Sequence, residues 1–478
     1  MSNLKNENKF NKINIINIFN LFFITLLLIL LVKLNLIPKN YMMIVTMVLT
    51  LYEIVCVVLT NIKNKICKVV GIILIVLSSC FSIVASYFLY NGNAFLDKAF
   101  DNTKKDNYIT YYVVTYSDNT ASNRNDINDT VYYVNNDSNI SSAINTLKKY
   151  TKNDIVESND IIDLFNKIAI KQTSFTLISN SSYEILFSNN SSLKKENYKI
   201  LYQFRIKTEN KVSENKNRSK EKFNIYISGT DFANLSDFNM IATINMNTHK
   251  ILLTSIPRDY YIPVYGTNGI RDNLSFIGVN DIDTRLKSIE NYFNIKFDYY
   301  LKINTNSLVG IVDAVGGIEY CSDQEFTTTH AAILNSYDDS KGKKLYIKKG
   351  CQHLNGIQTL TVARERNAFS GRDRIRQKNC QAIIVDIFEQ LKSVNTLTNY
   401  SNILNSVENL YETDIKREII ENIMKDTING ENWKFENQSV DGTDGQDLVH
   451  LNSMKGWVMY PTNETISKAR ENINETLK

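Results

Sequence analysis

Five of the chain's 13 arginines lie within residues 364–376, whereas lysine is the usual cation elsewhere in the sequence. The five are Arg364, Arg366, Arg372, Arg374 and Arg376. The planar, permanently charged guanidinium group can bind two phosphate oxygens at once, which a lysine ammonium cannot do. The local preference for arginine therefore indicates a phosphate-binding segment, although an exposed helix face with ion pairs would have the same composition.

Two carboxylates and a further arginine follow strand-like segments earlier in the chain. Asp231 and Asp237 come soon after the buried-type run Phe223–Ser228, and Arg258 also follows a strand-like run. Carboxylates at the carboxyl end of a strand can share a Mg²⁺ ion with phosphate oxygens. Loop capping by the aspartates, or a structural ion pair between Arg258 and Asp259 or Asp237, would explain the same residues. With the arginine-rich segment, this set favours a polyphosphate ligand.

The first 90 residues contain three apolar segments, Ile13–Leu36, Tyr41–Thr60 and Val69–Tyr90. Each has about 20 residues or more, enough to cross a bilayer, and three successive spans do not fit a cleaved signal peptide. Lysines precede the first segment and separate the second from the third, but the first turn carries only Lys39. The positive-inside rule therefore predicts a cytoplasmic N-terminus, with residues 91–478 outside the cell.

Glu53 lies within the second apolar segment. A carboxylate inside a membrane is a functional candidate by default. The other two segments offer it no obvious charged partner at that depth. We therefore interpret Glu53 as a protonated group or a polar contact between helices.

Composition excludes several other classes of function. A net charge of +4 over 478 residues gives no support to nucleic-acid binding. The four histidines are scattered and no Cys-x-x-Cys motif occurs, so a zinc site or a Ser-His-Asp hydrolase is poorly supported. Cys321 and Cys351 are expected outside the cell, where they flank a possible hairpin between Gly317 and Gly350. We predict a disulfide between them, with two buried free thiols as the alternative.

The rest of the chain divides into two α/β regions. Residues 91–107 and 209–221 are predicted linkers, and residues 108–208 alternate strand-like and helix-like runs, as in a small α/β accessory domain. Residues 222–478 are expected to form a layered α-β-α domain with a central mixed sheet. The helices predicted in this second domain include Asp283–Phe293, Thr305–Val315, Leu354–Arg366 and Arg376–Leu391.

In this order, the segments of residues 222–478 resemble the LytR–CpsA–Psr family of cell-wall glycopolymer ligases. The matching stretches are the GTD that ends at Asp231, SDFNMIATINMNTHKILLTSIPRDYYIPV, DYYLKINTNSLVGIVDAVGGIEY and KKGCQHLNGIQTLTVARERNAFSGRDRIRQKNCQ. No single triplet is specific to the family, but the ordered set is. A three-span anchor with an outward domain is also similar to members from Gram-positive bacteria.

The resemblance implies a phosphotransferase whose donor is an anionic glycan, such as teichoic acid or a capsule-like polysaccharide, on a polyprenyl-pyrophosphate carrier. A hydroxyl of the peptidoglycan acceptor, usually the C6 hydroxyl of N-acetylmuramic acid, would attack the sugar-linked phosphate and release polyprenyl phosphate. Such transfer depends on positioning and charge neutralisation, which Mg²⁺ (or Mn²⁺) and arginines supply. The family also buries the carrier lipid between sheet and helices, where the candidates are Leu308, Ile311, Val312 and Val315.

The charged site residues of the family have counterparts here, which are Asp231, Asp237, Arg258, Asp259, Arg364, Arg366, Asp373 and Arg376. The resemblance implies metal binding by Asp231 and Asp237. It implies phosphate binding by the arginines.

Three positions depart from the family pattern. Ala233 stands where an arginine is common, and Asn273 stands where a lysine is expected, with Arg271 two residues before it. Cys380 occupies the place of an expected glutamine, and Gln381 comes one residue late. Arg271 could therefore replace the missing lysine as a phosphate ligand.

Other functions stay open at this point. The same site could act as a phosphatase that only hydrolyses the lipid pyrophosphate. A membrane-anchored sensor or regulator of envelope assembly is a second alternative, although no helix-turn-helix signature or cytoplasmic domain supports it. Residues 108–208 could also bind a glycan or a partner, because they are similar to half of a solute-binding domain.

Overall fold

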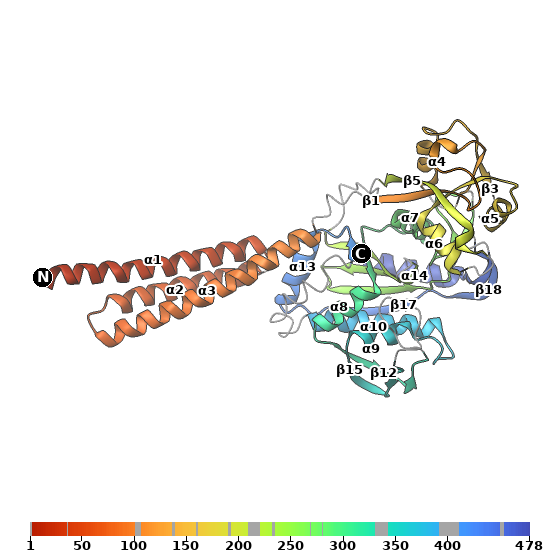
Figure 1. Ribbon diagram of the computed structural model, residues 1–478. Helices are drawn as coiled ribbons and strands as arrows, with labels where there is room; N and C mark the ends of the chain where they lie inside the picture. Colours follow the sequence, from red (N-terminus) through yellow and green to blue (C-terminus); the bar gives the residue numbers. More distant parts are fainter. Residues whose placement is uncertain are drawn as a thin grey trace. The chain divides into compact units, whose positions relative to one another are not determined.

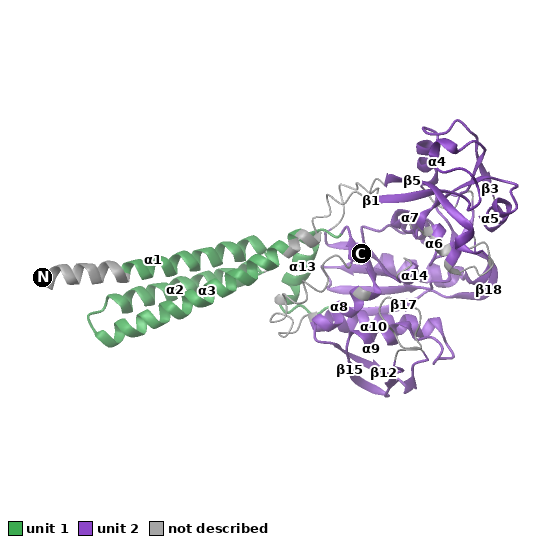
Figure 2. Ribbon diagram, viewed as in Figure 1, with its two compact units in different colours: residues 1–102, 394–408, 415–433 green, residues 103–393, 409–414, 434–478 purple. Residues whose placement is uncertain are grey.

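The computed structural model of the chain contains two compact units (Figures 1 and 2). It describes residues 2–35, 37–100, 107–135, 139–158, 161–189, 193–208, 220–231, 235–267, 269–279, 281–329, 343–391, 411–449 and 454–478. Ala233 and most of the predicted linker 209–221 lie outside the described residues. The first unit comprises residues 1–102, 394–408 and 415–433, and the second comprises the remainder.

Long apolar helices dominate the first unit. They are α1 (Ser2–Leu34), α2 (Lys39–Asn61) and α3 (Lys65–Phe100). The parts long and apolar enough to cross a membrane are Asn14–Leu34, Lys39–Asn61 and Lys65–Ala94. These ranges confirm the three predicted apolar segments and indicate a membrane anchor. Helix α3 continues to Phe100, within the range that the sequence assigned to a linker.

A buried polar contact joins the three apolar helices. The Asn20 side chain of α1 donates a hydrogen bond to the Glu53 carboxylate of α2. Ser78 and Ser79 of α3 donate to the side-chain oxygen Oδ1 of Asn20 at 2.6 and 2.8 Å. The structure thus places Glu53 in a polar contact between helices, one of the two interpretations drawn from the sequence.

The first unit also contains α13 (Arg417–Ile428), which comes from the far end of the chain. Arg417 forms ion pairs with Asp97 of α3 and with Glu421 one turn along its own helix. Its guanidinium group also donates to Asn93 at 2.9 Å, and Asn35 at the end of α1 donates to Glu421 at 3.2 Å. Polar contacts therefore hold α13 against α1 and α3.

A five-stranded sheet forms the region predicted as an accessory domain. Its strands are β1 (Asn107–Tyr116), β2 (Val131–Val134), β3 (Ile155–Ser158), β4 (Phe175–Ser179) and β5 (Tyr198–Thr208), in the order β3-β2-β4-β1-β5. The helices of this region are α4 (Ile140–Leu147), α5 (Ile161–Ala169) and α6 (Asn180–Asn189). Two separate apolar clusters, one including Tyr111 and Phe175 and the other Phe165 and Tyr183, form its core.

A six-stranded mixed sheet forms the centre of the second region. Its strands are β6 (Lys222–Thr230), β7 (Ser236–Asn245), β8 (Lys250–Ile256), β11 (Tyr299–Asn304), β16 (Tyr411–Thr413) and β17 (Lys434–Ser439). The order is β16-β11-β6-β7-β8-β17. Strands β11 and β17 run parallel to their neighbours β6 and β8, whereas the other pairs are antiparallel. The predicted mixed sheet is confirmed.

Helices cover both faces of this sheet (Figure 1). On one face α7 (Ile282–Phe293) and α14 (Asn463–Thr476) pack into a core that includes Tyr226, Ile289 and Ile473. The other face carries α8 (Thr305–Ala314), α9 (Gly356–Arg364) and α10 (Asp373–Leu391). The layered α-β-α arrangement expected from the sequence is therefore present.

Four two-stranded ribbons complete the second unit. They pair β9 (Tyr261–Pro263) with β10 (Arg271–Asn273), β12 (Ile318–Ser322) with β15 (Gly350–Leu354), β13 (Phe326–Thr327) with β14 (Tyr346–Ile347), and β18 (Gly442–Val449) with β19 (Met454–Pro461). Cys321 faces Cys351 across the β12–β15 pair and forms a disulfide with it, at a Cα–Cα distance of 3.9 Å. The predicted disulfide is confirmed.

The predicted starts of two helices were wrong by two or three residues. The helix expected over Leu354–Arg366 begins only at Gly356, because Leu354 belongs to β15 and the Asn355 side chain caps the helix by accepting from the Gln358 N–H at 2.9 Å. The helix expected from Arg376 begins three residues earlier, at Asp373. A carboxylate in the first turn is favourable because it faces the positive end of the helix dipole.

Candidate active site

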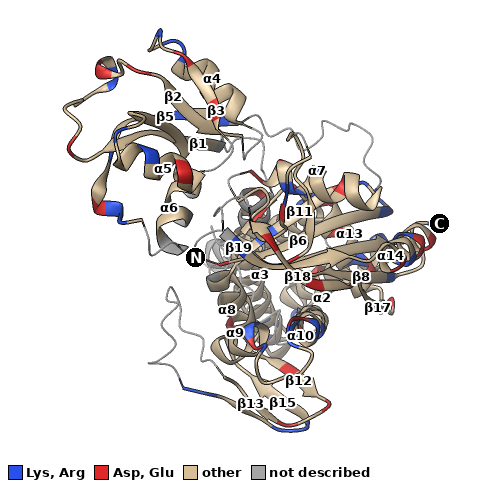
Figure 3. Ribbon diagram, turned by 90° about the vertical axis from the view of Figure 1, so that its right-hand side faces the viewer, with Lys and Arg blue, Asp and Glu red and all other residues tan. Residues whose placement is uncertain are grey.

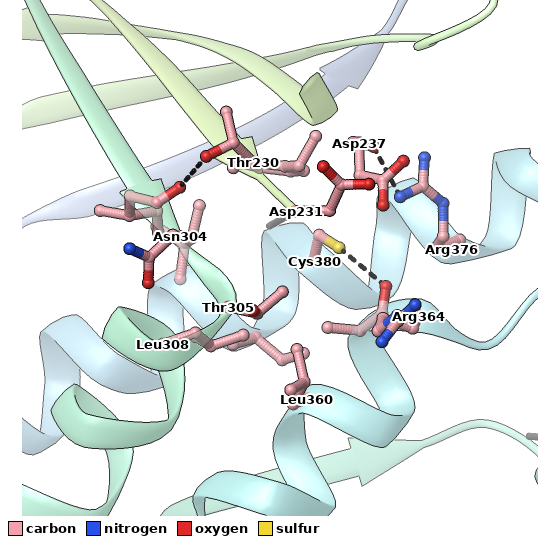
Figure 4. Close-up of a pocket in the computed structure, with 16 residues that line it drawn as sticks. Thr230, Asp231, Asp237, Asn304, Thr305, Leu308, Leu360, Arg364, Arg376 and Cys380 are labelled. Atoms are coloured by element: carbon pink, nitrogen blue, oxygen red, sulfur yellow. Dashed lines mark hydrogen bonds between the residues drawn. The ribbon is translucent and has the colours of Figure 1, made fainter. Parts of the chain in front are cut away.

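A cavity lies between the ends of β6 and β11 and the helices α8, α9 and α10 (Figure 4). Its wall is apolar over most of its area, with side chains that include Phe238, Ile303, Leu308, Leu360, Ala363, Ile383 and Ile384. Four charged residues also line it, Asp231, Asp237, Arg364 and Arg376. The ribbons of both α9 and α10 include basic positions (Figure 3). A charged group therefore adjoins an apolar pocket.

The connection between β6 and β7 positions the two aspartates. The pairing of these strands shifts register between Gly229 and Thr230, just before Asp231. Asp231 exchanges two hydrogen bonds with Leu235, since its N–H donates to the Leu235 carbonyl at 3.1 Å and its Oδ1 accepts the Leu235 N–H at 2.9 Å. Asp231 thus caps the loop and also lines the cavity, so the capping and ligand-binding interpretations are compatible.

Asp237 is the centre of a group of three arginines. The Arg258 guanidinium group donates to Asp237 Oδ1, and Arg366 Nη2 lies 3.9 Å from the same oxygen. Arg376 Nη1 donates to the main-chain carbonyl of Asp237 at 2.6 Å. Burial raises the pKa of Asp237, but the charges of Arg258, Arg376 and Arg366 outweigh that effect and hold its pKa below the usual value. Asp237 is therefore ionised at neutral pH.

A second carboxylate, Asp373, orients the arginines from the first turn of α10. Arg376 Nε and Nη2 lie 2.7 and 2.6 Å from Asp373 Oδ1, and Arg366 Nε lies 3.6 Å from it. Gln377 Nε2 donates to the other oxygen at 3.0 Å. Burial raises the pKa of Asp373, but the charges of Arg376 and Arg366 lower it by more. The pKa of Asp373 is therefore below its usual value. Asp373 therefore fixes two guanidinium groups beside Asp237.

Among the described residues, two arginines of the site have guanidinium nitrogens that make no hydrogen bond. Arg258 Nε is buried and lies 3.3 Å from Asp259 Oδ1, yet it makes no hydrogen bond. Among the described residues, Arg364 has no ion-pair or side-chain hydrogen-bond partner, and it lines the cavity. Burial, with the charges of Arg376 and Arg258, lowers the pKa of Arg366 to about 10, which leaves that group charged at neutral pH. The cluster can therefore bind an additional anion.

The arginine-rich segment divides between two tasks. Arg364, Arg366 and Arg376 belong to the site, whereas Arg374 pairs with Asp441 at 2.7 Å and lies 3.5 Å from Asp444. Arg374 therefore ties the start of α10 to β18 and its preceding turn. The ion-pair interpretation therefore holds for Arg374, and phosphate binding by the other three arginines stays a prediction.

The three departures from the family pattern have different positions. Arg271 Nη1 donates to the Tyr261 carbonyl at 3.3 Å on the β9–β10 ribbon, and Arg271 does not line the cavity. Cys380 does line it, and burial raises the pKa of its thiol to about 11. Gln381 Nε2 donates instead to the carbonyls of Leu253 and Gln438, which belong to adjacent strands. Ala233 lies outside the described residues.

The sequence located only part of the apolar wall. Leu308 lines the cavity as expected, but Ile311, Val312 and Val315 do not, and the lining residues of α9 and α10 were not anticipated. Leu360, Ile383 and Ile384 each lie within one or two turns of a site arginine or of Cys380 on the same helix. That spacing was the available signal, since residues three or four apart share a helix face.

The carboxylates of Asp231 and Asp237 are suitable ligands for a weakly held divalent cation. No cluster of three or more His, Cys, Asp or Glu side chains that could hold a metal occurs in the part of the chain that the structure describes. Asp231 and Asp237 line the same cavity, and Figure 4 shows their carboxyl groups at one end of it. Mg²⁺ commonly takes one or two protein carboxylates and completes its shell with water and phosphate oxygens. Two carboxylates beside a phosphate-binding cluster fit that requirement.

Comparison with known proteins gives the family. A model of the LytR_cpsA_psr family matches residues 182–475, more than half of the chain. The polyisoprenyl-teichoic acid–peptidoglycan teichoic acid transferase TagU of Enterococcus faecalis is 27% identical over 252 residues, which are 49% of this chain and 78% of that protein. TagU of Bacillus anthracis is 28% identical over 184 residues, 38% of this chain, and the match spans 56% of that relative. The crystal structure of B. subtilis TagV aligns at 23% identity over 54% of this chain and 98% of that one, with a TM-score of 0.45. By the extent of the family match, this chain belongs to the LytR_cpsA_psr family.

Proposed function

We propose that this protein transfers an anionic glycopolymer, such as teichoic acid or a capsule-like polysaccharide, from a polyprenyl-pyrophosphate carrier to a hydroxyl of peptidoglycan. The relatives named above are teichoic acid transferases. The observation that carries the proposal is the arginine–aspartate cluster at the edge of an apolar cavity. A pyrophosphate attached to a long hydrocarbon needs both environments side by side.

The proposed reaction is a phosphoryl transfer. The acceptor hydroxyl oxygen forms a bond to the phosphorus that carries the polymer's first sugar. The bond from that phosphorus to the bridging oxygen breaks, and polyprenyl phosphate leaves with the electron pair. The hydroxyl proton passes to a site carboxylate or to water. The products are a phosphodiester between polymer and peptidoglycan, and the carrier monophosphate.

The arginines have distinct roles in this proposal. Arg364, which lines the cavity, and Arg258, which is paired with the cavity-lining Asp237, bind pyrophosphate oxygens. Arg376 is only 3% exposed and holds both Asp373 and the main chain of Asp237, so it acts mainly by keeping the cluster in place. Preorganised cations of this kind stabilise charge that develops on the leaving oxygen.

Asp231 and Asp237 would hold Mg²⁺ (or Mn²⁺) together with the donor's phosphates. When bound, the cation would neutralise negative charge on the phosphate oxygens. The main-chain and arginine contacts of the two aspartates fix their carboxylates before the donor arrives. Affinity for the cation without donor is expected to be weak, since the phosphates supply much of its coordination.

The apolar wall is the proposed site of the carrier lipid. Leu308, Leu360 and Ile383 present hydrocarbon to the cavity from three different helices. We also propose that residues 91–478 lie outside the cell, as the lysine distribution along the first 90 residues favours. Protease treatment of intact protoplasts should then remove this part of the chain, whereas its full protection would contradict the orientation.

The decisive experiment is product analysis with the full chain in lipid nanodiscs, a defined lipid-linked polymer donor and peptidoglycan fragments. Transfer predicts a polymer–glycan phosphodiester that appears together with polyprenyl phosphate. A phosphatase would release free polymer phosphate at the same rate with or without acceptor. Absence of both products would favour a regulatory role.

A further inference from the structure

The largest side chain that is completely buried in the described part of the molecule is a cation, Arg285 of α7. It is 1% exposed and lies on the sheet face opposite the cavity helices. Its Nε donates to the Ile277 carbonyl at 2.7 Å and its Nη1 to Ser228 Oγ at 3.2 Å. Its Nη2 makes no hydrogen bond, and no carboxylate among the described residues lies within ion-pair distance of it.

This arrangement is unfavourable for stability. A buried cation without a counter-charge loses its hydration and gains no matching attraction, and an apolar side chain of similar volume is often more stable in its place. Burial lowers the pKa of Arg285. The nearby Tyr226 hydroxyl opposes this most, and Asp281 and Glu412 oppose it less, from beyond ion-pair distance. Residues that break a rule of packing at a cost in stability are expected at functional sites.

The contacts of Arg285 lead to the two site aspartates. Ser228, its hydrogen-bond partner, lies 2.8 Å from Ser236 through the two hydroxyl oxygens. Ser228 stands three residues before Asp231, and Ser236 stands directly before Asp237. The guanidinium group thus connects β6 and β7 where both strands approach the carboxylates.

The segment of residues 275–277 also belongs to this hydrogen-bond network. The Ser236 N–H donates to the Ser275 carbonyl at 3.1 Å, and the Ile277 carbonyl accepts from Arg285. The Ser275 N–H in turn donates to the Arg258 carbonyl at 2.8 Å. One buried cation is therefore bonded to a network that includes the backbone of Arg258 and the strands that carry Asp231 and Asp237.

We propose that Arg285 is a positioning residue for the phosphotransfer, acting through Ser228 and Ser236 to set the spacing of Asp231, Asp237 and Arg258. The proposal rests on the proposed function. It makes a prediction that a purely structural role does not make. Removal of the charge should leave stability unchanged or higher, while it displaces the site and lowers turnover.

The test compares Arg285→Met, Arg285→Lys and Ser228→Ala in the full chain. We expect Arg285→Met to keep or raise Tm and to lower kcat at least tenfold, because displacement of a site by about 1 Å can cost a hundredfold. Arg285→Lys keeps the charge but loses the planar arrangement of several N–H donors, so it should retain only part of the wild-type kcat. Ser228→Ala should lower kcat less, with little change in Tm.

Ser288→Ala is the matched control. Ser288 is buried on the same helix, but its hydroxyl donates to Thr284 and accepts the Tyr265 N–H, away from the network. It should keep kcat. Parallel losses of Tm and kcat in Arg285→Met and Arg285→Lys would show a structural role only. Full kcat in Ser228→Ala together with Arg285→Lys would overturn the proposal even if Arg285→Met failed to fold.

A binding measurement separates this proposal from the proposed function. Calorimetric titration with inorganic pyrophosphate and Mg²⁺ reports the geometry of the site without any transfer. If the wild-type protein binds pyrophosphate but transfers nothing, the proposed function fails, and a tenfold weaker affinity in Arg285→Met still supports positioning. Equal pyrophosphate affinity in the wild-type protein, Arg285→Met and Ser288→Ala would overturn it.

Discussion

The two faces of the six-stranded sheet differ in how completely they are packed. Under α7 and α14 the face is closed, and Tyr226, Ile289 and Phe293 are completely buried in one continuous core. Under α8, α9 and α10 the same strands border a cavity with an apolar wall and charged residues at its edge. Because both faces use the same backbone, the difference lies in the side chains and in the helices that cover them.

The two faces differ in whether their buried charged side chains have partners of opposite charge. On the open face, Arg258 and Arg376 lie against Asp237 and Asp373, and those carboxylates have lowered pKa values. On the closed face, no carboxylate among the described residues lies within ion-pair distance of Arg285. The open face thus holds its charges in a stable array that can accept an anion, whereas the closed face carries a charge at the expense of stability.

The largest effect is expected from the two aspartates of the open face. The Asp231→Asn, Asp237→Asn double variant should lose all metal-dependent transfer, because amides neither neutralise nor hold a divalent cation as carboxylates do. Titration of Mg²⁺ in the presence of the lipid-linked donor measures this. Asp447→Asn, on the β18–β19 ribbon, is a control that should titrate as the wild type does. Full activity of the wild type in chelator would remove the metal from the mechanism.

The arginines of the open face should rank next. Arg258→Ala and Arg364→Ala are each expected to lower kcat about 10²–10³-fold, the typical loss when one preorganised donor is removed from a site. Lysine should restore little, because it lacks the paired donors of the guanidinium group. Arg374→Ala is the control, since Arg374 binds Asp441 rather than the cavity. Near-normal turnover of Arg258→Lys would instead favour a simple electrostatic role.

Packing offers a direct comparison of the faces. Ile289→Ala, in the closed core, should lower the free energy of unfolding by about 3 kcal/mol, because it leaves a cavity that cannot collapse. Leu360→Ala should cost less, since its side chain already borders a cavity, and it should raise KM for the lipid-linked donor. Chemical unfolding and donor kinetics measure the two effects. Equal losses of stability would mean that the open face is packed as tightly as the closed one.

Local patterns in the sequence were sufficient for most of the elements. The apolar segments of α1, α2 and α3 and the strands β6, β8 and β11 depend on residues close together in the chain. The start of α9 could not be predicted from local patterns, because Leu354 pairs with Ile318 across the β12–β15 ribbon, which also contains the Cys321–Cys351 disulfide. Such a pairing joins residues more than thirty positions apart and leaves no periodic signal.

Some residues of the site could be predicted from the sequence, and others could not. Arg364, Arg366 and Arg376 were apparent from composition, and the structure places all three near the aspartates or the cavity. Arg285 was not anticipated, since an arginine on an amphipathic helix is usually solvated. Its burial results from contacts with Ile277 and Ser228, which lie in other elements. The contact of Arg271 with the Tyr261 carbonyl also depends on a ribbon that the sequence did not reveal.

The smallest effect tests how each face treats a carboxylate. Burial, and next the charge of Asp281, raises the pKa of Asp283 on α7 to about 6. An acid whose pKa is higher in the folded than in the unfolded protein contributes stability below its unfolded value, near 3.9, and this stability is lost as pH rises through 6.

Asp283→Asn should therefore raise the free energy of unfolding at pH 8 by roughly 1–2 kcal/mol, after allowance for partial solvent exposure, and change nothing at pH 4. Asp237→Asn should do the opposite. The pKa of Asp237 is lowered in the folded protein, so its contribution is present above the unfolded value and is lost as pH falls through the folded one. Unfolding of both variants in denaturant at the two pH values measures the contrast. If both variants shifted stability in the same direction at pH 8, the two faces would not differ in their treatment of charge.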